Sequence, residues 1–164
     1  MQNRLTEFEY YLQFERRYSP KTISAYRRDL QTFLIACQEK GITEWEGVTS
    51  HHVRMVASQQ FQKGSSSSSL ARLLSAVRSF YKYLIKKQGL TFNPATDITV
   101  PVRSRALPKT MDVDEIDTLL NVSGNDFLST RDIAVCELFY SSGLRLAELI
   151  NTNLLDVDLN DRLI

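Results

Sequence analysis

Apolar residues recur at helical spacing along four separate stretches of the first 90 residues, and this pattern constrains the fold more than any other feature. Residues 5–17, 20–40, 50–61 and 70–87 each place one apolar stripe along one helical face. A helix with such a stripe must bury it against another element of the structure. The sequence therefore predicts a bundle of four helices over residues 1–90.

Capping residues and helix-breaking residues separate these stretches. The pair Ser19-Pro20 joins a good N-cap to a proline that suits the first position of a helix, so it predicts a helix start. Gly41 and Gly89 predict the ends of the second and fourth helices, because glycine tolerates the left-handed backbone that closes a helix. Residues 65–69 are all serine and form a low-complexity turn, in which Ser69 is the predicted cap of the fourth helix.

A second unit follows a basic linker. The sequence predicts this linker over residues 91–110, because prolines at positions 94 and 101 exclude an extended helix there. Residues 111–164 predict the N-terminal part of a further domain. Its predicted parts are, in order, an acidic helix start at 112–115, a loop over 121–130, a helix over 131–140 and a turn toward a strand over 151–159.

One arginine stands where two predicted helices meet. Gly143 predicts a helix end, and residues 144–150 predict a short helix that places Arg145 in its first turn. The N–H groups of a first turn and a guanidinium together suit a phosphate, because arginine donors match two phosphate oxygens. Glu148 lies three residues on, and it either orients the guanidinium or makes an ordinary ion pair with it.

The formal net charge of +1 hides an asymmetry between the two parts of the chain. Residues 1–110 hold 17 basic and 8 acidic residues, whereas residues 111–164 hold 3 basic and 11 acidic residues. A basic front part predicts a polyanionic partner for that part alone. The alternative is a solvated basic face that has no partner.

The second and fourth predicted helices carry cations and hydroxyls opposite their apolar stripes. Such side chains reach phosphates and base edges, as a helix in a major groove requires. A solvated polar face is again the alternative. The residues concerned are Lys21, Thr22, Ser24, Arg27 and Arg28 on the second helix, and Arg72, Ser75, Arg78, Ser79 and Lys82 on the fourth.

The sequence favours neither a membrane protein nor a metal site. No apolar run approaches the roughly 18 residues of a membrane span and the start lacks the apolar core of a signal peptide, so we expect a cytoplasmic protein. His51 and His52 have no Cys, Asp or Glu at ligand spacing, so we expect surface histidines and no metal. Cys37 and Cys136 lie far apart on apolar helical faces and predict two buried, reduced thiols.

Several segments resemble the tyrosine site-specific recombinases of the lambda-integrase family. Residues 143–149, Gly-Leu-Arg-Leu-Ala-Glu-Leu, resemble the first-arginine motif of these enzymes. Segment 108–114 and the leucines around Arg145 resemble the XerC-like side of the Xer branch. The other matching segments are 107–109, 112–115 and 131–134, which precede the motif in the family's order, and 19–22, 26–30 and 69–81, which resemble the N-terminal DNA-binding domain of the Xer branch.

The resemblance implies a mainly α fold: an N-terminal helical (SAM-like) core-binding bundle of four helices over 1–90, the linker over 91–110, and the helical start of a truncated α/β catalytic domain over 111–164. It implies site-specific DNA recombination through a phosphotyrosyl intermediate, and chromosome dimer resolution, by the full-length enzyme. Arg145 would be a catalytic arginine supported by Glu148, and no cofactor is expected.

The resemblance places the remaining catalytic residues, including the nucleophilic tyrosine, beyond position 164. We therefore expect this 164-residue chain to bind DNA without cutting it, and its seven tyrosines to be core or interface aromatics. The implied DNA contacts are Lys21, Thr22, Arg27, Arg72, Ser75 and Arg78.

The partners implied by the resemblance are double-stranded DNA with a palindromic Xer-type site, an XerD-like recombinase in a heterotetramer, and a septal DNA translocase. Two other interpretations stay open. One is a phage or transposon integrase of the same superfamily, and the other is a helical protein-interaction module without DNA specificity.

Overall fold

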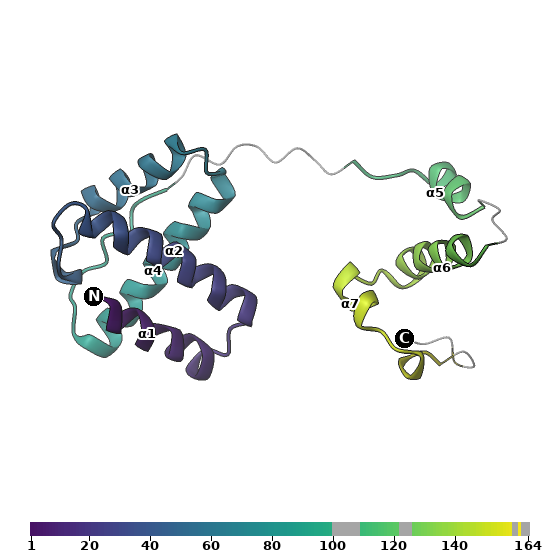
Figure 1. The fold of residues 1–164 in the computed structure, drawn as a ribbon, viewed down its shortest axis with the longest axis horizontal. Helices are drawn as coiled ribbons and strands as arrows, with labels where there is room; N and C mark the ends of the chain where they lie inside the picture. Colours follow the sequence, from purple (N-terminus) through teal and green to yellow (C-terminus); the bar gives the residue numbers. More distant parts are fainter. Residues whose placement is uncertain (100–108, 122–125, 159–160, 162–164) are drawn as a thin grey trace. The chain divides into compact units, whose positions relative to one another are not determined.

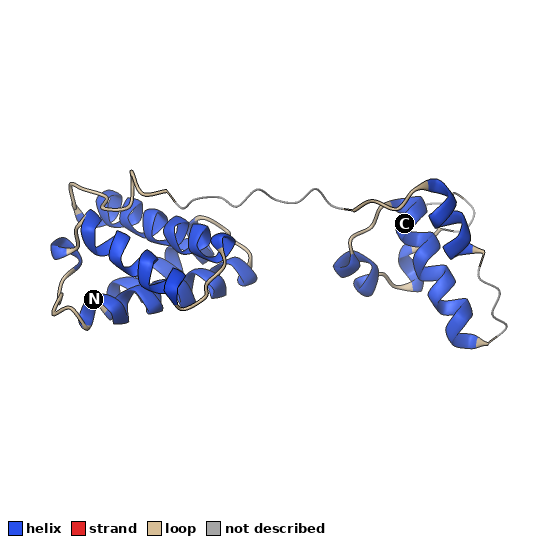
Figure 2. Cartoon of the chain, turned by 90° about the horizontal axis from the view of Figure 1, so that it is seen from above, coloured by secondary structure: helices blue, strands red, loops and turns tan. Residues whose placement is uncertain are grey.

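The computed structural model describes residues 1–99, 109–121, 126–158 and 161. The chain divides into two compact units, Met1–Arg105 (unit 1) and Ala106–Ile164 (unit 2), and each is described by itself. The described residues of both units form helices and loops and no strand (Figure 2). The sequence predicts a turn toward a strand over 151–159, and the short 3₁₀ turn Leu154–Asp156 lies within this range. Apart from Asp161, the residues after 158, where the strand is expected, and most of the predicted linker, with Arg103 and Arg105, lie outside the described residues.

Unit 1 contains the four predicted helices (Figure 1). The first, α1, begins at Gln2, earlier than predicted, and it passes into a π-helical turn, η1. α2 and α4 pack against each other, and each of them also packs against α1 and α3, so these two helices form the centre of the bundle. The bounds are α1 Gln2–Tyr10, η1 Tyr11–Glu15, α2 Pro20–Gln38, the short 3₁₀ turn η2 Trp45–Gly47, α3 Ser50–Gln62 and α4 Ser67–Gln88.

The helix starts of unit 1 follow local side-chain chemistry. Ser19 caps α2 as predicted, since its Oγ accepts the N–H of Thr22 at 3.2 Å. The cap predicted for α4 is wrong: Ser66, not Ser69, fills that position, and its Oγ accepts the N–H of Ser69 at 3.2 Å. Every serine of the run can cap a helix, so the sequence does not select among them.

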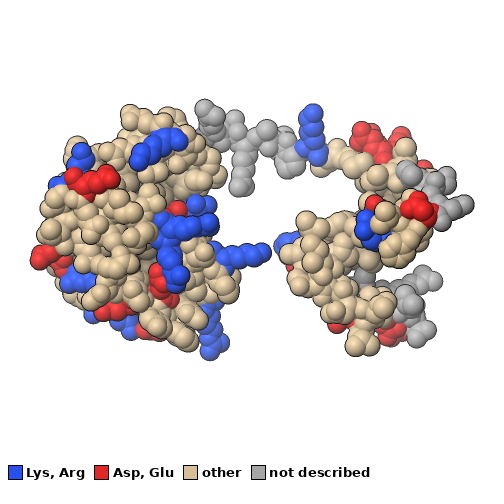
Figure 3. Space-filling view, viewed as in Figure 1, with Lys and Arg blue, Asp and Glu red and all other residues tan. Residues whose placement is uncertain are grey.

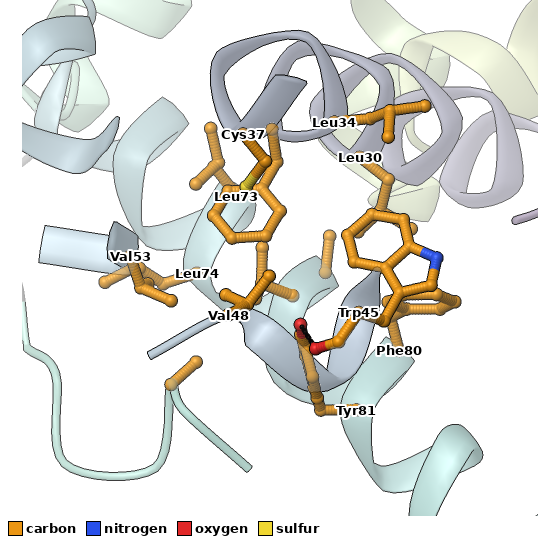
Figure 4. Close-up of a cluster of buried hydrophobic side chains, with 14 of the residues drawn as sticks. Leu30, Leu34, Cys37, Trp45, Val48, Val53, Leu73, Leu74, Phe80 and Tyr81 are labelled. Atoms are coloured by element: carbon orange, nitrogen blue, oxygen red, sulfur yellow. Dashed lines mark hydrogen bonds between the residues drawn. The ribbon is translucent and has the colours of Figure 1, made fainter. Parts of the chain in front are cut away.

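The core of unit 1 is rich in aromatic rings (Figure 4). Trp45 is 1% exposed; its indole N–H donates to the Met1 carbonyl at 3.1 Å, and its ring meets that of Phe80 edge to face at 4.8 Å. The hydroxyl of Tyr81 donates to the Trp45 carbonyl at 2.9 Å, and burial raises the pKa of this phenol. The apolar stripe predicted for α4 is buried at every position, namely Leu70, Leu73, Leu74, Val77, Phe80, Tyr81 and Leu84.

The chain after α4 remains packed on the bundle as far as Ile98. Gly89 closes the helix with φ +74°, as predicted. Ala95 and Ile98 then join the core, with exposures of 0% and 6%. The first described part of the predicted linker thus packs on unit 1, while the proposed limits of the linker at 91 and 110 remain a prediction.

Unit 2 consists of α5 Val113–Leu120, α6 Phe127–Ser142, α7 Leu146–Asn151 and the 3₁₀ turn η3 Leu154–Asp156. The predicted loop over 121–130 is too long. Asp126 caps α6, since its Oδ1 accepts the N–H groups of Leu128 and Ser129 at 3.0 and 3.1 Å, and the helix begins four residues earlier than predicted. Gly143 ends α6 with φ +65°, as predicted.

Candidate functional site

Basic side chains gather over α2 and α4 of unit 1, with a few acidic side chains among them (Figure 3). These two helices pack against each other, so the polar faces predicted on each lie on neighbouring surfaces. Five of the six predicted DNA contacts lie on α2 or α4 and have no hydrogen bond to the described part of the chain that follows α4, whereas the sixth, Arg78, contacts that chain. The five are Lys21, Thr22, Arg27, Arg72 and Ser75.

Arg72 is fixed by an acidic residue on the neighbouring helix. Its Nε donates to Oδ2 of Asp29 at 2.8 Å and its Nη2 donates to Oδ1 at 3.2 Å, which is a bidentate pair. Asp29 is 8% exposed and is the one buried charged residue in the described part of the chain. The side chain of Arg72 remains 45% exposed. Asp29 therefore binds the guanidinium through Nε and Nη2, while Nη1 has no acceptor among the described residues.

Sequence reasoning did not single out Asp29. A signal was present, because Asp29 precedes Phe33 by four residues and so lies on the buried face of α2. A carboxylate there requires a partner, since an unpaired buried charge is costly. The partner on α4, 43 positions away in the sequence, could not be found from local spacing.

The remaining candidate contacts on α2 and α4 differ in how they are held. Nη2 of Arg27 pairs with Oε2 of Glu9 at 2.5 Å on the exposed surface, a kind of ion pair that water screens well. Oγ1 of Thr22 shares a hydrogen bond of 2.9 Å with Oγ of Ser19, and Oγ of Ser75 donates to the Ala71 carbonyl at 2.8 Å. Lys21 is exposed and has no ion pair within the described residues. Lys21 is thus the unneutralised cation of the set.

Arg78 has a structural task in unit 1. Its Nε donates to the Ala95 carbonyl at 2.8 Å and its Nη2 donates to the Ile98 carbonyl. Asn93 completes this contact, because its Nδ2 donates to the Arg78 carbonyl at 3.1 Å. The Arg78 side chain thereby holds residues 93–98 against α4. A direct contact between Arg78 and DNA remains a prediction.

The predicted arginine site of unit 2 has a geometry different from that expected. Arg145 is not in the first turn of α7 but precedes it as the N-cap, with extended backbone angles of φ −77° and ψ 152°. The reason is local: Gly143 closes α6 with left-handed backbone angles, and Arg145 is still extended two residues later, so the next helix begins only at Leu146. Its side chain is 85% exposed.

Glu148 contacts Arg145 twice. Its Oε2 accepts the backbone N–H of Arg145 at 2.7 Å, and its Oε1 accepts Nη1 of the guanidinium at 2.9 Å. The backbone N–H, followed by the guanidinium, lowers the pKa of the Glu148 carboxyl below its ordinary value. The Glu148 carboxylate thus makes the i,i+3 ion pair and also binds the Arg145 backbone, while an orienting role for Glu148 in catalysis remains a prediction.

The predicted histidine, thiol and tyrosine environments are only partly as expected. Nδ1 of His52 accepts the N–H of Thr49 at 3.1 Å, which closes the start of α3. Cys37 is buried, and its burial raises the thiol pKa to about 11, whereas Cys136 is only half-buried. Tyr81 and Tyr83 are buried, and the others are less so; Tyr10 and Tyr140 are the most exposed.

The described residues contain no group of three or more His, Cys, Asp or Glu side chains placed to hold a metal ion. Among the described helices, none combines the length and the apolar character that crossing a membrane requires.

The fold and the paired basic helices match a known domain. A sequence model of the family "Phage integrase, N-terminal SAM-like domain" matches residues 5–88, which are the helices α1 to α4. The chain therefore belongs to the phage integrase family defined by this domain.

The relatives are more specific. The chain is 45% identical to the "Tyrosine recombinase XerC" of Pseudomonas syringae pv. tomato over 165 aligned residues, which is 100% of this chain and 55% of that protein. It is 42% identical to the protein of the same name from Stutzerimonas stutzeri over 97% of this chain and 54% of that protein. A crystal structure of the XerA recombinase covers 98% of this chain and 53% of that chain, with 26% identity and a TM-score of 0.48.

The chain spans about half the length of the curated relatives that it matches. The matches confirm the predicted resemblance to the tyrosine recombinases and to their XerC-like side, and they confirm the predicted SAM-like helical bundle. They leave untested the residues that contact DNA, the role of Arg145 and the domain limits.

Proposed function

We propose that unit 1 binds double-stranded DNA for a tyrosine recombinase of the XerC type, which cuts and rejoins DNA at a specific site in the cytoplasm. The observation that carries this proposal is the packing of α2 against α4 within a phage-integrase domain, where Arg72 of α4 pairs with Asp29 of α2 and both helices carry cations and hydroxyls. A helix that offers both cations and hydroxyls suits a major groove, because cations bind phosphates and hydroxyls reach base edges.

The proposed contact residues have different roles in DNA binding. Lys21 and Arg27 neutralise phosphates, Thr22 and Ser75 donate from their hydroxyls, and Arg72 faces the groove. Arg78 supports this surface by holding residues 93–98 on α4, so it positions the chain that leaves the domain. Since each phosphate contact releases counterions, binding should weaken steeply with salt.

For the full-length enzyme we propose that Arg145 acts on the scissile phosphate. Its guanidinium would neutralise charge on the nonbridging oxygens while a tyrosine hydroxyl attacks phosphorus, which forms a 3′-phosphotyrosyl bond and releases a 5′-hydroxyl. Glu148 acts as the positioning residue, because it holds both the backbone and the guanidinium of Arg145. The bond energy is kept in the phosphotyrosyl link, so the reaction requires no cofactor.

We further propose that the 164-residue chain binds DNA without cutting it. The buried Tyr81 and Tyr83 are unsuited to attack, because a phenol must reach the phosphate and lose its proton. A suicide duplex with a nick near the cleavage position traps a covalent adduct whenever cleavage occurs. Incubation with the purified chain should leave no adduct on a denaturing gel, and an adduct there would overturn this part of the proposal.

The proposed partners follow from the same class of enzyme. A palindromic site would bind one XerC-type and one XerD-like protomer on each duplex, which gives a heterotetramer across two duplexes, and a septal DNA translocase would act on this assembly during chromosome dimer resolution. Cooperative binding of the chain and an XerD-like protein to a full site would support the first of these partners.

The test of DNA binding uses a duplex with an Xer-type half-site and a scrambled duplex of equal length, each at two salt concentrations. The proposal expects a preference for the half-site and a steep loss of affinity with salt. Equal binding to both duplexes would leave a generic basic domain. Absence of binding at low salt would favour the protein-interaction module, and preference for an unrelated attachment site would favour a phage or transposon integrase.

A further inference from the structure

Arg72 and Asp29 form a bidentate ion pair across α2 and α4. A positive charge for binding DNA would not by itself require this pair. The carboxylate of Asp29 occupies the Nε edge of the guanidinium, with contacts at 2.8 and 3.2 Å. Nη1 of Arg72 has no acceptor within the described residues, and the side chain is 45% exposed. The ion pair therefore leaves Nη1 and the second N–H of Nη2 without an acceptor among the described residues, and it fixes the direction of the guanidinium.

We propose that Arg72 recognises a guanine in the major groove through direct hydrogen bonds. Asp29 is the positioning residue that holds the Arg72 guanidinium in the orientation required for this contact. The proposal rests on the proposed DNA binding of unit 1. The N–H groups that the ion pair leaves on Nη1 and Nη2 provide two parallel donors. Guanine presents two parallel acceptors, O6 and N7, on its major-groove edge, and no other base does so.

The charge of Asp29 argues against a phosphate as the main target of Arg72. A carboxylate in direct contact with the guanidinium offsets its positive charge and repels an approaching phosphate diester. The guanine edge is neutral, so it meets no such repulsion. Lys21, which has no ion pair in the described part of unit 1, has the opposite character and suits a phosphate.

The fixed geometry also favours specific recognition. A free arginine loses rotamer entropy when it binds, whereas Arg72 has already lost part of it to Asp29. Asp29 itself is fixed, because it is buried on α2, where that helix packs against α4. By contrast, Arg27 pairs with Glu9 at a more exposed place, where the pair is easily exchanged for water.

The experiment selects bound duplexes from a pool with randomised central base pairs, using the 164-residue chain. The wild-type chain should enrich a guanine at one position. Arg72→Lys and Asp29→Asn should each reduce the preference for that guanine about tenfold, as loss of one bidentate contact does, and leave the other positions unchanged. Asp29→Asn should also raise affinity for unrelated duplexes, because it removes a negative charge from the surface.

Two control variants distinguish the effect of losing the Asp29 charge from the effect of losing the fixed position of the Arg72 guanidinium. Glu44→Gln makes the same charge change as Asp29→Asn on the exposed connector before α3, so it should raise general affinity to a similar or smaller extent without changing the preferred guanine. Lys21→Ala should lower the salt dependence by about one phosphate contact, whereas Arg72→Lys should leave it nearly unchanged.

A chemical substitution then identifies the contact. Replacing the selected guanine by 7-deazaguanine removes N7, so it should weaken wild-type binding about fivefold to tenfold and weaken binding of Arg72→Lys much less. Thermal unfolding shows whether Asp29→Asn remains folded. If it does not, the Arg72→Lys variant and the deaza duplex decide the matter by themselves.

The outcomes distinguish the two proposals. Failure to enrich any duplex would overturn the proposed DNA binding and this inference with it. Enrichment in which no guanine depends on Arg72, or a uniform loss at all positions in the folded variants, would overturn the reading role of Arg72 and leave DNA binding intact.

Discussion

Units 1 and 2 both contain helices with many apolar residues but bury these residues very differently. In unit 1 the stripes of four helices meet, and residues such as Phe8, Phe33 and Phe80 have no exposed surface. In unit 2 the helices α5, α6 and α7 contain no buried side chain, and Phe127 is 80% and Leu155 99% exposed. The comparison teaches that an apolar stripe predicts a helix, while its burial depends on whether a partner surface is present.

The largest expected effect lies in the core of unit 1. Phe80→Ala should lower the free energy of unfolding by about 3–5 kcal/mol, because it removes a fully buried ring and leaves a cavity against Trp45. Leu155→Ala in unit 2 should change it by less than about 0.5 kcal/mol. Urea unfolding followed by Trp45 fluorescence measures the effect in unit 1, and unfolding followed by far-UV circular dichroism measures the effect in unit 2; equal effects would contradict the difference between the units.

The two cysteines probe the same difference by chemistry. Cys37 is fully buried in unit 1 with a thiol pKa of about 11, two units above the ordinary value of 9.0, which lowers its thiolate fraction roughly a hundredfold. Cys136 in unit 2 is half-buried. Iodoacetamide at pH 8 should therefore label Cys136 at least about a hundredfold faster, as followed by mass spectrometry of peptides.

Labelling in strong urea is the control for this comparison. Both thiols should then react at similar rates, because the burial of Cys37 is lost. Fast labelling of Cys37 in the native chain would mean that unit 1 opens readily, which its core does not lead us to expect.

Arg78 tests how far unit 1 extends. Arg78→Ala should destabilise unit 1 by about 2 kcal/mol, since it removes charge-assisted hydrogen bonds to two carbonyls. It should also expose residues 93–98 to proteolysis. Lys82→Ala, an exposed neighbour on α4, should do neither. A protease-resistant 93–98 segment in Arg78→Ala would show that the core contacts of Ala95 and Ile98 suffice.

The smallest effect concerns Glu148 and pH. Its folded pKa is lowered, chiefly by the Arg145 backbone N–H, so its stabilising contribution is present above the ordinary value of 4.5 and is lost as pH falls through the lowered folded pKa. Carboxyl NMR titration should give a midpoint below 4.5 for the Glu148 carboxyl. Arg145→Ala should restore only part of the shift, because the backbone N–H remains; a midpoint at or above 4.5 would contradict the cap geometry.

Local chemistry made much of the fold predictable. Ser19 and Pro20 start α2, Gly89 ends α4 and Gly143 ends α6, because each signal acts within one helical turn. The errors arise where the signal is repeated or weak. The serine run offers several possible N-caps for α4. The N-cap of α6, Asp126, lies inside a polar stretch for which the sequence predicts a loop.

The arrangement of the candidate site was less predictable. The basic faces of α2 and α4 could be read from spacing, but the pairing of Arg72 with Asp29 and the contacts of Arg78 with two carbonyls depend on tertiary packing. The position of Arg145 as a cap rather than a first-turn residue depends on how the chain leaves Gly143. Side-chain types thus indicate chemistry, and only the packed structure says which groups are already engaged.

The most direct test of the proposed function is an NMR titration of the isotopically labelled chain with a half-site duplex. We expect chemical-shift changes along the shared polar surface of α2 and α4, with Lys21 and Arg72 among the strongly affected residues, and small changes in unit 2. Shifts confined to α5, α6 and α7, or an unchanged spectrum at low salt, would contradict the assignment of DNA binding to unit 1.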